Sequence, residues 1–294
     1  MTLPTRIVVC TNRRPDQVAE CLTALRAQAG DEAPLLVTSG LRPEQVEGHR
    51  EAFPGTVIEE PRPGLSLARN RALDACPNDG VIAFVDDDAV VEPGWWEALK
   101  RRWEEAPDEV AVIGGPIRPR YDTPPPRWLS RPLLPALTLL DLGGRVLDLD
   151  PEVTTVYGAN ISFRVAPLRE VGGFDPDFGH SGKRVFFSEE DEAQRELARV
   201  GHTVRYVPDA AVLHVIPPER LTRAAFVRRR FWYGVTLGAR QARPTWLALR
   251  QMVSSAAGAP VAALRRNDRL FMERLVRAAE NAGVLAARAR SGRA

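Results

Sequence analysis

Short apolar runs alternate with stretches of helical periodicity through the first part of the chain. The apolar runs are rich in β-branched and aromatic residues, so they predict buried strands. These runs are Arg6–Cys10, Pro34–Thr38, Thr56–Ile58, Val81–Val85 and Val110–Gly115. The intervening segments predict helices. They span about residues 18–29, 43–50, 63–74 and 93–105. This alternation predicts a parallel, doubly wound sheet.

The central run Val81–Val85 is followed at once by three carboxylates, Asp86, Asp87 and Asp88. Adjacent anions are costly to bury without a compensating cation, so the strand must end here with the acids at its carboxyl end. In open α/β sheets, this end of a strand is where ligands bind. Carboxylates there suit Mg²⁺ or Mn²⁺ shared with substrate phosphates. The alternative is a solvated acidic turn.

Two common nucleotide-binding motifs are missing from the sequence. No Gly-x-Gly-x-x-Gly follows the first strand, and the chain has no Walker-type lysine loop. The sequence therefore disfavours a dinucleotide-binding domain and a P-loop domain.

The second half of the chain has a less regular pattern. Pro116–Pro135 is rich in proline, which excludes a long helix or a central strand and predicts an ordered excursion or lid, or else an inert loop. Thr155–Phe163 predicts a strand interrupted at residues 158–160, where a backbone or a ligand approaches closely. Thr203–Val207 predicts a further strand. His214 follows it, and a lone histidine is more often structural than a metal ligand.

A run of acids opens the helix predicted after Ser188. Ser188 is a good N-cap, and acids in the first turn complement the helix dipole, so capping accounts for part of Glu189–Glu192. Four acids exceed what capping requires, and one of them turned into a cleft is suited to act as a general base. The helix is predicted to end at Gly201.

The composition is typical of a soluble globular protein, with 294 residues, 44% hydrophobic and 27% charged. This length fits one large α/β domain or two small ones. No apolar run approaches the roughly 18 residues of a membrane span, and Met1–Cys10 lacks a secretory signal pattern. Cys10, Cys21 and Cys76 have no metal-ligand spacing, which indicates reduced thiols in a cytoplasmic protein.

The net charge of +2 conceals an asymmetry along the chain. Residues 219–294 contain sixteen arginines, no lysine and four acids, or about +12, which leaves about −10 on residues 1–218. A basic tail indicates an anionic partner, or a helical face solvated by arginines. An apolar stripe in the tail is suited to lie on an anionic membrane or to pack on the core. The stripe consists of Phe271, Leu275, Ala279, Ala282 and Leu285.

Four segments occur in an order and spacing that resemble the family-2 glycosyltransferases with a GT-A fold. They are Val8–Arg13, Gly64–Asn70, Phe84–Asp88, and Gly158–Phe163 running on to Val171–Asp175 and the acidic helix. Each segment is weak alone, but their joint order over residues 5–240 is specific. The resemblance implies an α/β fold, with a Rossmann-like, mixed, mostly parallel sheet flanked by helices, in residues 1–218. It divides them into a nucleotide-sugar half (1–115) and an acceptor half (116–218), and makes residues 219–294 a basic helical extension.

Members of this family transfer a sugar from a nucleotide-activated donor to an acceptor hydroxyl, with inversion at the anomeric carbon. The resemblance therefore implies a transferase that depends on Mn²⁺ or Mg²⁺ and acts in glycan, glycolipid or glycoconjugate biosynthesis. The expected acceptor is a glycan, a lipid-linked sugar or a small molecule, and nucleic acid is not expected as a partner. We expect a cytoplasmic protein, and peripheral contact of the C-terminal extension with the inner face of the cell membrane is an additional hypothesis.

The matched motifs also imply site residues. The nucleotide-sugar site should comprise Thr11, Asn12, Arg13, Ser39, Arg69, Asp86 and Asp87. Within it, residues 11–13 should hold the base and ribose, and Asp86 should contact the ribose or a metal-bound water. Asp88 should coordinate the divalent ion that bridges the diphosphate, with His214 as a second metal contact.

One position departs from the family pattern. Family members often carry an aspartate just after the second strand, where it pairs with uracil, but this chain has Thr38-Ser39-Gly40 there. Hydroxyl groups still bond to the edge of a base, but they do not select uracil in the same way. UDP-, GDP- and dTDP-sugars are therefore all open as donors.

The family's catalytic base is the second acid of a pair that opens the helix after Gly-Gly-Phe-Asp. Gly201 matches the glycine that ends this helix in the family, and counting back from it makes Glu189-Glu190 the pair and Glu190 the base. A literal match of the letters to Glu190-Asp191 makes Asp191 the base instead. The spacing favours Glu190. The alternative to an active enzyme is a non-catalytic or nucleotidyltransferase-like GT-A domain. Thr11–Pro15 disfavours the nucleotidyltransferase because it supplies no glycine-rich loop.

Overall fold

The computed structural model describes residues 3–30, 34–176, 180–181, 184–185 and 189–291. The chain forms two compact units. Unit 1 contains residues 1–119, 140–184 and 188–215, and unit 2 contains residues 120–139, 185–187 and 216–294. All site residues expected from the sequence belong to unit 1.

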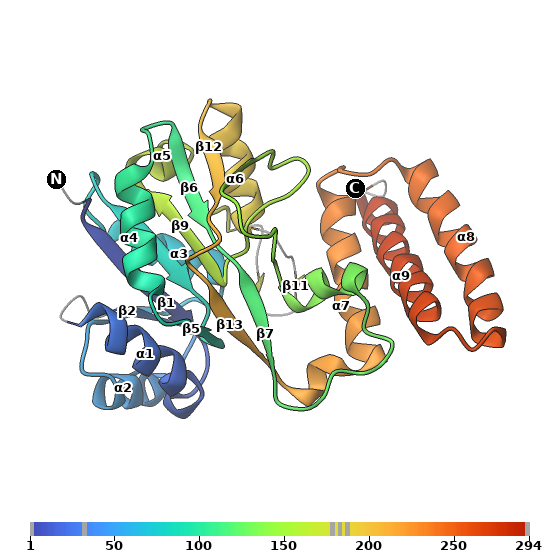
Figure 1. The fold of residues 1–294 in the computed structure, drawn as a ribbon, viewed down its shortest axis with the longest axis horizontal. Coiled ribbons are helices and arrows are strands. Elements are labelled where there is room, and N and C mark those ends of the chain that lie inside the picture. Colours follow the sequence, from blue (N-terminus) through green and yellow to red (C-terminus); the bar gives the residue numbers. More distant parts are fainter. Residues whose placement is uncertain (1–2, 31–33, 177–179, 182–183, 186–188, 292–294) are drawn as a thin grey trace. The chain divides into compact units, whose positions relative to one another are not determined.

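Unit 1 is built on an eight-stranded sheet with the order β3-β2-β1-β4-β9-β6-β12-β8 (Figure 1). Its strands are β1 (Thr5–Thr11), β2 (Leu35–Ser39), β3 (Val57–Glu60), β4 (Val81–Val85), β6 (Val110–Gly114), β8 (Leu147–Leu149), β9 (Asn160–Arg164) and β12 (Thr203–Tyr206). β1 to β4 run parallel, as do β6 and β12. β9 is antiparallel to β4 and β6, and β8 is antiparallel to β12. The expected mixed, mostly parallel sheet is confirmed.

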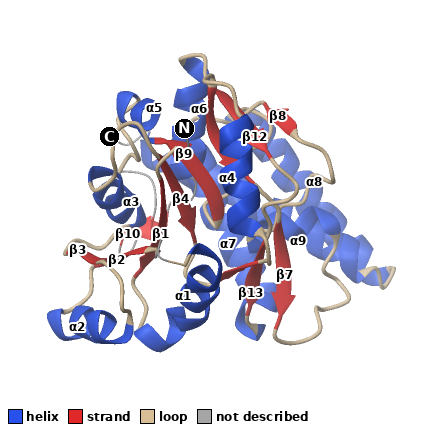
Figure 2. Ribbon diagram, turned by 60° about the vertical axis from the view of Figure 1, so that its left-hand side comes forward, coloured by secondary structure: helices blue, strands red, loops and turns tan. Residues whose placement is uncertain are grey.

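Helices cover both faces of this sheet (Figures 1 and 2). They are α1 (Pro15–Ala29), α2 (Pro43–Ala52), α3 (Leu65–Asp74), α4 (Trp95–Glu105), α5 (Val165–Glu170) and α6 (Glu189–Arg199). α1 ends at Gly30, whose φ of 55° suits glycine, as the sequence predicted. α4 is fixed to β9 because the buried indole N–H groups of Trp95 and Trp103 donate to Asn160 and Ser162.

The strand predicted over Thr155–Phe163 forms only in its second part, where β9 begins at Asn160. The preceding glycine explains the interruption, because a Cβ on Gly158 would overlap the guanidinium group of Arg69. The close approach indicated by the sequence is therefore made by a buried arginine of α3.

A second sheet has three strands in the order β5-β13-β7, namely β5 (Ala89–Val91), β13 (Val212–Ile216) and β7 (Ile117–Tyr121). β13 is antiparallel to β5, with His214 opposite Ala89, and this register brings the histidine close to the Asp86–Asp88 triplet. β7 lies in the proline-rich stretch and forms an edge, where a strand tolerates proline. β10 (His180–Ser181) and β11 (Arg184–Val185) form a separate two-stranded sheet.

Unit 2 combines a proline-rich segment with the C-terminal helices. Its elements are the 3₁₀ helices η1 (Arg131–Leu137) and η2 (Pro218–Leu221), and the α-helices α7 (Arg223–Ala239), α8 (Thr245–Leu264) and α9 (Asp268–Ser291). α9 packs against both α7 and α8 and lies between them (Figure 1). Glycines permit the α7–α9 contact, because a Cβ on Gly234 or Gly283 would overlap the backbone of the other helix. In the part of the chain that the structure describes, no helix is long and apolar enough to cross a membrane.

The apolar stripe of the tail lies on this middle helix, α9. Its five side chains, Phe271 to Leu285, are half-buried. The guanidinium group of Arg223 on α7 lies over the ring of Phe271, 5.7 Å from its centre. The stripe is therefore only partly covered, and the buried face of α9 is formed by other side chains, among them Met272, Val276 and Val284.

Candidate active site

The turn after β1 and the aspartates after β4 form one cluster. Thr11 Oγ1 donates a hydrogen bond to Asp87 Oδ2 at 2.6 Å, and Arg13 Nε lies 3.3 Å from Asp87 Oδ1. Arg13 Nη2 also donates to Asp88 Oδ2 at 2.9 Å. β1 and β4 are adjacent parallel strands, so their carboxyl ends bring these side chains together.

Asp88 also meets His214 from β13. His214 Nε2 lies 3.2 Å from Asp88 Oδ1, and the histidine is 2% exposed. A carboxylate beside an imidazole is a suitable donor pair for Mn²⁺ or Mg²⁺. No group of three His, Cys, Asp or Glu side chains suited to a metal occurs among the residues described. The pair fits an ion that takes its other ligands from substrate phosphates and water.

Burial dominates the electrostatics of the aspartate cluster. It raises the pKa of Asp87 to about 6, although the charge of Arg13 and the Thr11 hydroxyl act in the opposite direction. Burial also raises the pKa of Asp86, and the charge of Arg69 offsets part of this shift. An added cation would stabilise the ionised carboxylates, so the cluster is suited to a divalent ion.

Arg69 lies buried between the aspartate cluster and the acidic helix α6. Its Nη1 donates to Glu189 Oε1 at 2.9 Å and lies 3.5 Å from Glu190 Oε2. Its Nη2 lies 3.8 Å from Asp86 Oδ1. The rings of Phe84 and Phe174, which contact each other edge to face, both lie beside the guanidinium group, with their centres 5.4 and 5.5 Å from its carbon. Arg69 thus connects α6 with the end of β4, and its contact with a nucleotide stays a prediction.

One guanidinium group therefore faces three carboxylates, those of Glu189, Glu190 and Asp86. Burial raises the pKa of Glu189 to about 8, and the charge of Glu190 acts in the same direction. Arg69 lowers this pKa without cancelling the shift. Burial, reinforced by the neighbouring acids, therefore raises the pKa of Glu189 enough to favour its protonated form over part of the neutral pH range.

The two candidate bases at the start of α6 have different surroundings. Glu190 Oε1 accepts a hydrogen bond from Gly158 N at 3.2 Å, and its side chain is 16% exposed. Asp191 is buried and accepts a hydrogen bond from the hydroxyl of Thr155. Glu190 shares Arg69 with the aspartate cluster, whereas Asp191 is engaged by the segment before β9.

Ser39 takes part in the backbone packing of unit 1 and is not free in the predicted site. Ser39, buried at the end of β2, bonds to the backbone: its Oγ is 3.0 Å from Arg62 O and 3.0 Å from Gly64 N. It ties β2 to the start of α3, and its contact with a base edge stays a prediction. Asn12 is exposed. Ser188, the expected N-cap of α6, lies outside the described residues.

His49 is a positioning residue that sequence analysis missed. It is 1% exposed on α2, and its Nε2 lies 2.8 Å from the carbonyl oxygen of Arg13, which accepts the bond. His49 therefore holds the turn that carries Thr11 and Arg13. The sequence could have indicated its burial, because His49 follows Val46 by three residues and both therefore lie on the inner face of α2.

The model of the family described as "Glycosyl transferase family 2" matches residues 6–172, more than half of the chain. The chain belongs to this family. The matched range includes all of β1 except Thr5, together with Arg69 and the three aspartates after β4. The resemblance inferred from the sequence motifs is confirmed.

Two named relatives support a glycosyltransferase that acts in glycan or glycoconjugate biosynthesis. The chain is 29% identical over 238 residues to the glucosyl-dolichyl phosphate glucuronosyltransferase of Haloferax volcanii, covering 78% of this chain and 74% of that protein. It is 30% identical over 249 residues to the succinoglycan biosynthesis protein ExoM of Rhizobium meliloti, covering 81% and 75% respectively.

Two solved structures show the same fold as this glycosyltransferase. The mannosyltransferase PcManGT from Pyrobaculum calidifontis, in complex with GDP-Man and Mn²⁺, matches 96% of this chain and 87% of its own, with a TM-score of 0.63 and 19% identity. GalNAc-T7 with UDP, GalNAc and Mn²⁺ matches 83% and 52%, with a TM-score of 0.57 and 13% identity. The expected GT-A fold is confirmed.

Proposed function

We propose that this glycosyltransferase is metal-dependent and inverts the anomeric carbon of its donor sugar. The observation that carries the proposal is the 3.2 Å approach of His214 Nε2 to Asp88 Oδ1 beside the end of β4. Asp88 and His214 would hold Mn²⁺ or Mg²⁺ when the ion binds with the diphosphate of the donor. When bound, the ion offsets negative charge on the departing nucleoside diphosphate.

The donor is a nucleotide-sugar held by the turn at residues 11–13 and by Arg69, Asp86 and Asp87. Arg13 is 39% exposed and pairs with Asp87 and Asp88. A cation held by Asp88 would compete with Arg13 for that carboxylate, and the guanidinium group would then be able to bind a donor phosphate. UDP-, GDP- and dTDP-sugars are the candidates. The two solved structures with GDP-Man and with UDP support this class of donor.

Glu190 is the general base. It takes the proton of the acceptor hydroxyl while the oxygen forms a bond to the anomeric carbon on the face opposite the nucleotide. The bond between that carbon and the diphosphate oxygen breaks in the same displacement, so inversion needs no covalent intermediate. The partial exposure of Glu190, beside Arg69, supports this assignment, and the engagement of Asp191 by Thr155 argues against Asp191.

The acceptor in this proposal is a sugar carried on a lipid phosphate, and the enzyme acts in the cytoplasm at the inner face of the membrane. The support is the Haloferax relative, whose name gives it a dolichyl-phosphate-linked substrate. A free glycan or a small-molecule acceptor would require the same base and the same donor site.

A screen of nucleotide-sugars for Mn²⁺-dependent release of nucleoside diphosphate tests this function. Release that is equally fast without divalent ions would overturn the metal dependence. Asp88→Ala should abolish divalent-dependent binding of the matching nucleotide in calorimetry, because it removes one of the two proposed protein ligands. Asp16→Ala, which removes an exposed carboxylate on α1, is the matched control. Unchanged affinity in Asp88→Ala would remove Asp88 from the metal site.

A further inference from the structure

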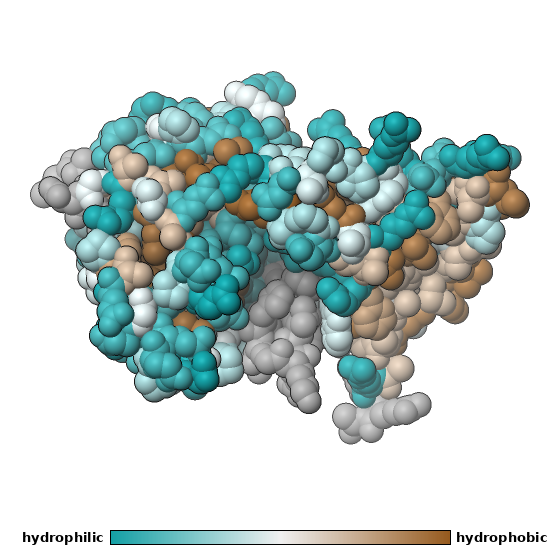
Figure 3. All heavy atoms as spheres, turned by 90° about the horizontal axis from the view of Figure 1, so that it is seen from below, coloured by the Kyte–Doolittle hydropathy of each residue, from teal (hydrophilic) through white to brown (hydrophobic). Residues whose placement is uncertain are grey.

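Helix α8 exposes an apolar face that its neighbours leave uncovered. Five of the eight large hydrophobic side chains that are exposed in the described residues lie on this one helix. Trp246 is 65% exposed and Leu264 is 85% exposed, at opposite ends of α8. Figure 3 shows apolar surface gathered over the C-terminal helices on the side that it presents.

These side chains form a single stripe. Trp246, Leu249, Val253 and Leu264 recur at helical spacing, so they share one face along α8. The opposite face has small buried residues, including Ser255, Gly258 and Ala262, and α8 packs against α9. The exposed stripe is therefore additional to the packing inside unit 2.

The charge on α8 itself and on the segments that flank it in the sequence is of one sign. From Arg220 to Asn267 the sequence contains ten arginines and no Lys, His, Asp or Glu. Arg250 lies within this apolar face of α8, and Arg265 and Arg266 follow its last turn; all three are exposed. A basic helix with exposed Trp and Leu is suited to lie in the interface of an anionic bilayer.

We propose that α8 is a docking surface for an anionic lipid bilayer, with its apolar stripe among the acyl chains and its arginines at the lipid phosphates. A second copy of the chain fits this face less well, because a symmetric contact would place the same cationic surface against itself. The proposal does not depend on the metal site or on the catalytic base.

Sedimentation of the full-length protein with vesicles tests the proposal. The protein should sediment with vesicles of mixed phosphatidylglycerol and phosphatidylcholine. A much smaller fraction of it should sediment with vesicles of phosphatidylcholine alone. Trp246→Ser with Leu264→Ser should lower the partition coefficient about tenfold or more, because two apolar anchors are lost. Val153→Ser with Val200→Ser, which alters exposed valines of unit 1, is the matched control.

Three outcomes would overturn the proposal: equal recovery on both kinds of vesicle, wild-type binding by the α8 double variant, or an equal loss in the valine control. Light scattering, which reports the oligomeric state, tests whether a second copy of the chain covers this face instead. A dimer that dissociates in the α8 variant, without any vesicle binding by the wild type, would assign the face to a second copy. Nucleoside diphosphate release with a soluble acceptor should be the same in wild type and α8 variant, which separates docking from catalysis.

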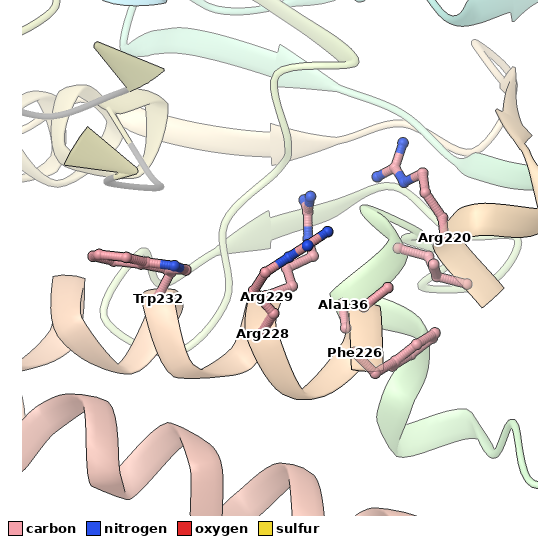
Figure 4. A pocket seen from close by; sticks show the side chains of 8 residues that line it. Ala136, Arg220, Phe226, Arg228, Arg229 and Trp232 are labelled. Atoms are coloured by element: carbon pink, nitrogen blue, oxygen red, sulfur yellow. The ribbon is translucent and has the colours of Figure 1, made fainter. Parts of the chain in front are cut away.

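An independent feature of unit 2 is a pocket of about 220 Å³ beside α7. Its lining residues are Ala136, Leu137, Arg220, Ala225, Phe226, Arg228, Arg229 and Trp232. Figure 4 shows Arg228, Arg229 and Trp232 rising from one side of α7, with Arg220 on the neighbouring segment. Arg229 Nη2 donates to Thr138 Oγ1 at 2.9 Å, which fixes its direction. The lining contains three arginines and no acid, and the rest is apolar or aromatic.

We infer that this pocket binds the phosphate or diphosphate group of an ester that carries an apolar substituent. Arginine is the preferred partner of phosphate oxygens, and the apolar wall gives an alkyl chain a contact that inorganic phosphate lacks. Calorimetry without divalent ions, which keeps the proposed donor site from contributing, should show tighter binding of a short alkyl diphosphate than of inorganic pyrophosphate.

Arg228→Gln with Arg229→Gln should weaken both ligands about tenfold or more, because charge-assisted hydrogen bonds are lost. Trp232→Ala should weaken only the alkyl ester. Arg250→Gln with Arg265→Gln, which removes the same charge elsewhere in unit 2, is the matched control. An equal loss of affinity in the control would show that the ligands are attracted by the basic surface in general and are not bound in the pocket. Affinity unchanged in the Arg228 and Arg229 variant would overturn the assignment.

Discussion

At the residue scale, Glu189 provides a test of the electrostatics beneath the candidate site. Its pKa is raised from 4.5 to about 8, so the folded state keeps a proton that the unfolded chain releases. The resulting contribution to stability is complete below about pH 4.5 and is lost as the pH rises to about 8. Glu189→Gln should remove this part of the pH dependence. Urea unfolding of both proteins between about pH 5 and about pH 9 checks it, and parallel curves would contradict it.

The two candidate bases are separated by kinetics. Glu190→Gln keeps the shape of the side chain but cannot accept a proton, so turnover should fall about 10²-fold or more while donor binding persists. Asp191→Asn should cost much less turnover, because Asp191 lies about 100° around the helix and bonds to Thr155. Turnover must be compared at saturating donor, so that a binding defect is not mistaken for slow chemistry. If only Asp191→Asn loses turnover, the assignment of Glu190 as the base by counting back from Gly201 is wrong.

The sequence predicted the chemical groups of the site better than it predicted their partners. The Asp86–Asp88 triplet follows from a buried strand that ends in acids, and the structure places His214 beside it. The pairing of Arg69 with Glu189 joins residues 120 positions apart, and His49 reaches Arg13 across 36. Such contacts depend on the order of the strands in the sheet, which no local pattern specifies.

At the scale of elements, periodicity predicted β1 to β4 and helices α1 to α4 well because strand and helix patterns differ strongly there, but it missed the short strand β5. It was less informative about which helix face is covered. The stripe predicted on α9 is only half-buried, because Met272, Val276 and Val284 form the buried face of that helix. Helix α8 has apolar or small residues on both sides and shows no contrast between them. The exposed face of α8 therefore became visible only once its packing partner was known.

The close contact of α7 and α9 predicts the effect of a single methyl group. In Gly283→Ala, the new Cβ would overlap the carbonyl oxygen of Phe231, so the helices must move apart. Overpacking typically costs about 1–3 kcal/mol, and the better helix propensity of alanine recovers up to about 1. The melting temperature should therefore fall. Gly144→Ala, where a Cβ meets no atom within 4 Å, is the control, and an equal fall there would contradict the packing argument.

At the scale of the whole molecule, charge is segregated along the chain. Residues 219–294 carry about +12 and residues 1–218 about −10. Like charges gathered in one part of a chain destabilise its compact state by self-repulsion. Arg223, Arg230 and Arg243 are paired with Asp268 and Glu280. We expect the remaining surplus of positive charge to oppose folding of unit 2, and an anionic surface or ligand would relieve it.

This segregation predicts how salt affects stability. Raising the salt concentration from about 0.01 M to about 0.15 M shortens the screening length from about 30 Å to about 8 Å. Repulsion among the arginines of unit 2 then weakens, so the melting temperature should rise, by about 2–4 °C for each kcal/mol gained. Arg265→Gln with Arg266→Gln removes part of the repulsion, so it should raise the melting temperature at low salt and reduce the response to added salt. Arg26→Gln, which removes a positive charge from the acidic unit 1, should not reduce that response. A melting temperature that falls with salt would show that attractive ion pairs outweigh the repulsion, and that the basic tail carries no electrostatic strain for an anionic partner to relieve.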